Sequence, residues 1–156
     1  MAANNQVNYN EPWILQRADP YVFFKDGYYY FTASVPAYDG IILRRSKTLN
    51  GLAEAEEKEV WHKHESGLMS EHVWAPEIHY LFGKWYIYFA AGEKENIWNI
   101  RPYVLECQGQ DPYNDPWIEK GKMTRAKDDI FSFEAFSLDA TIFENKGRYY
   151  YVWAEK

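Results

Sequence analysis

The sequence predicts an all-β protein of the β-propeller type, and three observations lead to this prediction. First, three segments share one pattern: a short apolar run, a turn that ends in glycine, and an aromatic run. Second, strand-like residues follow the first two of these segments, as expected for sheets of four strands. Third, 7 Trp, 14 Tyr and 9 Phe make 19% of the 156 residues aromatic, which suits a β-rich core.

Each repeated segment has the form of a β-hairpin. The repeat glycines Gly27, Gly83 and Gly147 are 56 and 64 residues apart, and each would supply the positive φ of a two-residue turn. Further strands are expected at residues 41–46 and 60–62 in the first unit, and at 101–107 and 116–119 in the second. The third hairpin ends near residue 154. Residues 1–156 therefore predict two four-stranded blades and half of a third, an incomplete propeller, since closure needs at least about four blades.

The composition excludes several classes of protein. With 47% hydrophobic and 26% charged residues, the chain is not of the disordered type. No apolar run approaches the roughly 20 residues of a membrane helix, and no heptad pattern indicates a coiled coil. The single cysteine, Cys107, excludes an internal disulfide framework and is expected to be a reduced, partly buried thiol.

Charge and aromatic content together indicate the kind of ligand. A formal net charge of −6 argues against a nucleic-acid partner, which needs clustered basic residues. Aromatic side chains without basic charge favour a neutral polyhydroxylated ligand, because the C–H faces of a sugar pack on rings. The first residues contain neither the basic nor the apolar part of a secretory signal, so a cytoplasmic location is expected.

The repeats also point to candidate catalytic residues. Eight positions before each repeat glycine stand Asp19, Ala75 and Asp139. If the segments are equivalent, these residues lie at matching ends of the innermost strands and face one central funnel. Two carboxylates there suit general-base catalysis. The alternative is that each aspartate only caps a turn.

Three motifs resemble those of glycoside hydrolase family 43. They are Arg-Ala-Asp-Pro-Tyr at 17–21, His-Val-Trp-Ala-Pro-Glu-Ile-His at 72–79 and Phe-Ser-Leu-Asp-Ala-Thr at 136–141. They occur in the family's order, and the likeness is greatest to the branch of α-L-arabinofuranosidases and β-xylosidases. The resemblance implies a five-bladed propeller whose axial pocket cleaves a terminal pentose with inversion, with residues 1–156 as the N-terminal part of that single domain.

The resemblance also implies roles for individual residues. Asp19 corresponds to the general base, and Asp139 to the carboxylate that orients the general acid and raises its pKa. The family's general acid, a glutamate within a motif such as Asn-Glu-Gly, is absent from this chain. Trp74 is expected to offer a ring face to the pentose. Glu77 is expected to make a structural hydrogen bond or salt bridge, and residues 34–36 are expected near the subsite without a specific role.

A glycosidase of this type requires no cofactor, and no metal site is expected. The four histidines, His62, His64, His72 and His79, lack the helical spacing of zinc hydrolases. Some relatives hold a cation, often calcium, on the propeller axis, but nothing in this sequence supports one.

The preferred function is thus the removal of terminal α-L-arabinofuranosyl residues from hemicellulose or arabino-oligosaccharides. A β-xylosidase of the same family is one alternative, and a non-catalytic carbohydrate-binding or assembly module is another. The expected partners are a pentose-containing saccharide and either a complementary C-terminal half or a second copy of the chain, with no nucleic acid and no membrane.

Overall fold

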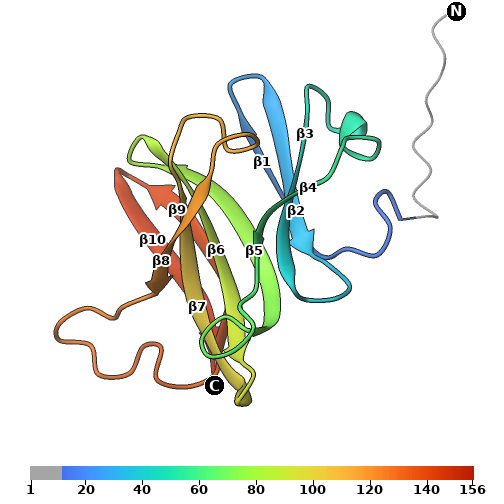
Figure 1. Ribbon diagram of the computed structural model, residues 1–156. Coiled ribbons are helices and arrows are strands. Elements are labelled where there is room, and N and C mark those ends of the chain that lie inside the picture. The colour runs from blue at the N-terminus through green and yellow to red at the C-terminus, as the bar shows by residue number, and fades with distance from the viewer. Residues whose placement is uncertain (1–11) are drawn as a thin grey trace, which may run out of the picture.

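The computed structural model describes residues 12–156, which form three antiparallel sheets (Figure 1). The first sheet has the order β1-β2-β3-β4 and the second β5-β6-β7-β8, while the third pairs β9 with β10. The strands are β1 (Ala18–Lys25), β2 (Tyr28–Ser34), β3 (Gly40–Ser46), β4 (Lys58–His62), β5 (Glu71–Leu81), β6 (Lys84–Glu93), β7 (Asn96–Cys107), β8 (Trp117–Lys122), β9 (Ser137–Asn145) and β10 (Arg148–Glu155). Two four-stranded blades and half of a third are therefore present, as the repeats predicted.

The three repeated hairpins have the predicted turn geometry. Gly27, Gly83 and Gly147 have φ values of 79°, 80° and 75°, and the residue before each of them also has a positive φ. Two consecutive positive φ values define a type I′ turn, whose twist matches that of the flanking strands. The turns thus fix the register of the inner two strands in every blade.

The second blade lies between the first blade and the two-stranded sheet (Figure 1). Its inner strand, β5, contacts β1 and β2 on one side and β9 on the other. The inner strands of the three sheets are therefore neighbours, which is the arrangement that lets residues from different blades line one pocket.

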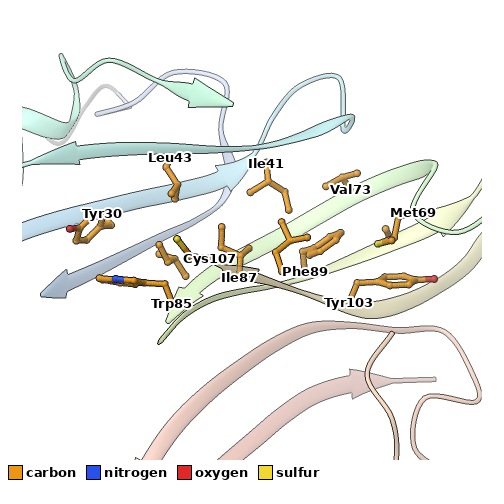
Figure 2. Close-up of a cluster of buried hydrophobic side chains, with 13 residues drawn as sticks. Tyr30, Ile41, Leu43, Met69, Val73, Trp85, Ile87, Phe89, Tyr103 and Cys107 are labelled. Atoms are coloured by element: carbon orange, nitrogen blue, oxygen red, sulfur yellow. The ribbon is translucent and has the colours of Figure 1, made fainter. Parts of the chain in front are cut away.

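The main core fills the space between the first two blades (Figure 2). Ile41 and Leu43 of the first blade face Ile87 and Phe89 of the second, and all four are at most 3% exposed. Truncation of a fully buried residue such as Ile87 to alanine typically costs about 2–5 kcal/mol. Cys107 is a free, buried thiol in this same cluster, as expected.

The long connection between β8 and β9 is attached to the end of β10. The carboxylate of Glu155 accepts hydrogen bonds from the backbone N–H groups of Phe133, Glu134 and Ala135 at 2.9–3.1 Å. Burial alone would raise the pKa of Glu155, but these three hydrogen bonds and one from Trp153 lower it to about 2. This attachment holds the start of β9, where Asp139 lies.

Helical structure in the described residues is limited to η1 (Asn50–Leu52), a three-residue 3₁₀ turn. No helix within residues 12–156 is long and apolar enough to cross a membrane.

Candidate active site

A left-handed residue interrupts each inner strand at the same repeat position. Asp19, Ala75 and Asp139 have φ values of 48°, 46° and 52°. At each of them the inner strand uses three residues where its partner uses two, which is a β-bulge. A non-glycine residue in this conformation costs about 1–3 kcal/mol, and such strain is concentrated at functional sites. The equivalence predicted from the glycine spacing is therefore present in the backbone.

The three bulged residues line one pocket of about 220 Å³. Its lining consists of Asp19, Pro20, Tyr21, Ala75, Glu77, Asp139 and Ala140. A bulge re-aims the side chain that it carries, and this explains how strands from three sheets deliver residues to one place. The structure thus brings together the two aspartates that the sequence singled out.

Asp19 is held by a hydrogen-bonded bridge between the first two blades. Ser34, at the end of β2 and 1% exposed, donates from Oγ to Oδ2 of Asp19 at 2.8 Å. The backbone N–H of Ala75 donates to the same Ser34 Oγ, also at 2.8 Å. One hydroxyl therefore connects two of the three bulged residues.

Asp139 lies in surroundings that raise the pKa of its carboxyl group. Partial burial and then the negative charge of Asp19 raise the pKa of the Asp139 carboxyl above its ordinary value. Each of these causes disfavours the ionised form. The influence of Asp19 on Asp139 is the like-charge coupling expected of two carboxyl groups that share a pocket.

Glu77 lines the pocket beside the two aspartates. Its Oε2 lies 2.9 Å from Nε2 of His79, whose side chain is 3% exposed, so the predicted polar contact of Glu77 is present. Burial and the charge of Glu77 raise the pKa of Tyr21 to about 12. From the sequence Glu77 is expected only as a structural contact, yet it lines the same pocket as Ala75.

Trp74 does not line this pocket but belongs to a row of aromatic rings beside Ala75. The His72 ring stacks on Trp74 at a centroid distance of 4.6 Å and lies 5.4 Å from Trp98, while Tyr38 meets Trp74 edge-on at 6.0 Å. Trp98 is 61% exposed. The sequence did not predict Trp98 as part of a site, because β7 begins at Asn96, five residues before the strand that the sequence predicts.

An ion cluster fixes the strand entry that precedes Asp19. Glu57 accepts from Arg17 Nε at 3.2 Å and from Arg44 Nε at 3.0 Å. Burial alone would raise the pKa of Glu57, but the hydrogen bonds from the two arginines lower it. Arg17 belongs to the first motif, and its guanidinium therefore acts on Glu57 rather than on Asp19.

Three histidine side chains of the described residues contact carboxylates, and none of them belongs to a metal-binding cluster. Within residues 12–156, no group of three or more His, Cys, Asp or Glu side chains is placed to hold one. Three histidines instead pair with separate carboxylates: His62 with Glu59, His64 with Glu119 and His79 with Glu77.

Blade-like antiparallel sheets whose inner strands bring carboxylates to one pocket define the class of β-propeller glycosidases. More particularly, the chain belongs to the glycosyl hydrolases family 43, whose sequence profile matches residues 9–156.

Two similar proteins are named extracellular exo-α-(1→5)-L-arabinofuranosidase. One is from Streptomyces chartreusis and one from Streptomyces avermitilis, and each is 48% identical over 155 residues, or 99% of this chain. Among solved structures, the α-L-arabinofuranosidase from Lactobacillus brevis is 50% identical, with a TM-score of 0.81 over 93% of this chain. The chain spans 45% and 31% of the two Streptomyces proteins and 46% of the Lactobacillus chain.

The expected cytoplasmic location is contradicted by these relatives, since both Streptomyces proteins are named as extracellular. The expectation rested on a signal that was not found in the first residues. The absence of that pattern does not determine where a protein acts.

Proposed function

We propose that this chain is the base-bearing part of an inverting α-L-arabinofuranosidase. The observation that carries the proposal is the convergence of Asp19 and Asp139, each on an equivalent bulge, on one pocket. The identity of 48–50% to proteins named as α-L-arabinofuranosidases supports arabinose as the sugar, rather than the xylose that the motifs alone left open.

In the proposed reaction, Asp19 is the general base. Its carboxylate accepts a proton from a water molecule, and the water oxygen forms a bond to the anomeric carbon as the bond to the leaving oxygen breaks. The general acid gives its proton to that leaving oxygen. An inverting pair of carboxyl groups stands roughly 6.5–9.5 Å apart so that the water fits between base and sugar.

The general acid is assigned to a residue outside the described part of the chain. Among residues 12–156, the carboxylates that line the pocket are Asp19, Glu77 and Asp139. Glu77 is paired with His79, and Asp139 is assigned to orienting the acid and raising its pKa. The relatives, which are more than twice as long as the matched region, have ample length for a further carboxylate.

Trp74 is assigned to sugar binding. Its ring lies next in sequence to Ala75, which lines the pocket, and it belongs to the row of rings that ends at the exposed Trp98. Aromatic faces pack well against the C–H faces of sugars. The proposed substrate is therefore an arabinose-containing oligosaccharide or polysaccharide whose terminal residue enters the pocket.

Replacement of Asp19 tests the proposed function. In the full-length protein, Asp19→Asn should lower kcat on an aryl α-L-arabinofuranoside by at least about a hundredfold, because the amide cannot accept the proton from water. The thermal unfolding temperature should change little, since Asn keeps the shape of Asp. Near-normal turnover by this variant would refute the assignment of the base.

The isolated 156-residue chain separates the enzyme from the alternative of a non-catalytic binding module. The chain alone should hydrolyse the aryl arabinofuranoside negligibly, and the full-length protein should hydrolyse it readily. Rapid turnover by the purified chain alone would mean that the acid is present within it. Saccharide binding without turnover by the full-length protein would instead support the binding module.

A further inference from the structure

The hydroxyl of Ser34 has a fixed donor direction. A backbone N–H can only donate, so the Ala75 amide occupies an acceptor position on Ser34 Oγ. The single hydroxyl proton is then directed to Oδ2 of Asp19, 2.8 Å away. Because Ser34 is 1% exposed, water does not compete for this proton.

The two oxygens of Asp19 consequently differ. Among residues 12–156, Ser34 supplies the one hydrogen bond that reaches this carboxylate, and no cationic side chain pairs with it. The titratable groups that share its pocket are Asp139 from β9, Glu77 from β5 and Tyr21 from its own strand. The donor from Ser34 is therefore the polar contact that orients this carboxylate within the described structure.

We propose that Ser34 is a positioning residue that holds Oδ2 of Asp19 as an acceptor and leaves Oδ1 to take the proton from water. The inference rests on the proposed function, in which Asp19 is the general base. When Oδ1 becomes protonated, Oδ2 still accepts from Ser34, so the bridge to Ala75 persists through the reaction. The hydroxyl thereby couples the orientation of the base to the bulge of the second blade.

Thr32 provides a matched control on the same strand. It lies two residues before Ser34, is 0% exposed, and its hydroxyl has no hydrogen-bond partner among residues 12–156. Ser34→Ala and Thr32→Val each remove one buried hydroxyl from β2, but only Ser34→Ala removes a donor to Asp19.

The experiment compares these two variants in the full-length protein. With an aryl α-L-arabinofuranoside, Ser34→Ala should lower kcat about tenfold with a smaller change in KM, because the donor to the ionised base is lost. Thr32→Val should alter neither value.

The outcomes separate this inference from the proposed function. An inactive wild-type protein would overturn the proposed function. An active protein whose kcat is the same in wild type and Ser34→Ala, or falls equally in Thr32→Val, would overturn the role of Ser34. Carbon-13 NMR of the Asp19 carboxyl at a fixed pH tests the bridge without turnover: its chemical shift should change in Ser34→Ala and not in Thr32→Val, and an equal shift in wild type and Ser34→Ala contradicts the inference.

Discussion

Asp19 and Asp139 occupy equivalent backbone positions but meet different surroundings. Asp19 accepts a hydrogen bond from Ser34, whose hydroxyl also accepts one from the backbone N–H of Ala75. Asp139 is subject to partial burial and to the charge of Asp19, and both raise its pKa. Different surroundings at two neighbouring acids are typical of sites that assign them different roles. One repeated position can thus serve a base in one blade and a modulating carboxyl in another.

The coupling between the two aspartates gives a prediction about titration. Asp19→Asn removes a negative charge next to Asp139, so the pKa of Asp139 should fall. It should stay above the ordinary aspartate value, because burial is the larger cause of the shift and remains in the variant. Carbon-13 NMR of the Asp139 carboxyl in the full-length protein measures this. A pKa of Asp139 that is equal in wild type and variant would show that the two groups do not interact.

At the scale of the elements, the sequence predicted the features that depend on local backbone conformation, such as the hairpin turns. A type I′ turn requires a positive φ, which glycine adopts without steric cost, so the three hairpins and the equivalence of Asp19 and Asp139 could be predicted from the glycine spacing. The bridge through Ser34 could not, since it joins residues that are 15 and 41 positions apart in the sequence. Such a contact depends on how two blades pack, which no strand pattern encodes.

The aromatic row depends on an unusual feature of the second blade. His72 on β5 and Trp98 on β7 meet across β6, where Gly92 carries no side chain. A Cβ at Gly92 would lie 2.6 Å from the carbonyl oxygen of Ile97, so only glycine permits this approach of the two strands. The row extends from Trp74, beside the pocket, to the exposed ring of Trp98.

This row predicts a contact with the sugar on the leaving-group side. In the full-length protein, Trp98→Ala should lower kcat/KM for an arabino-oligosaccharide about fivefold more than kcat/KM for an aryl arabinofuranoside, which has no second sugar to stack. Phe131→Ala is the matched control, since Phe131 is 78% exposed in the β8–β9 connection. A ratio of the two specificity constants that is equal in wild type and Trp98→Ala would contradict the contact.

At the scale of the whole molecule, the first blade and the two-stranded sheet both expose apolar side chains on the face that points away from the second blade. The outer face of the first blade exposes Val22 and Phe24, and that of the two-stranded sheet exposes Phe143, Tyr150 and Val152 at 40–49%. These residues alternate along the strands with those that pack toward the second blade, so both faces of each strand carry apolar side chains. That pattern is typical of strands with packing partners on both faces. Within the described residues, β10 also has one edge without a partner strand. Such faces and edges are typical sites of association.

We therefore expect the isolated 156-residue chain to self-associate, or to be poorly soluble, because further blades or a second copy would have to cover these faces. Val152→Lys should reduce association in sedimentation velocity, since a lysine within the apolar face opposes the burial of that face. Leu68→Lys is the control, because Leu68 is similarly exposed at 50% but lies in the β4–β5 connection. In the full-length protein the same substitution should be harmful: Val152→Lys should lower the unfolding temperature more than Leu68→Lys, because there the face is proposed to be buried against the next blade. A wild-type chain that sediments as a compact monomer would show that neither the open edge nor the apolar faces need a partner.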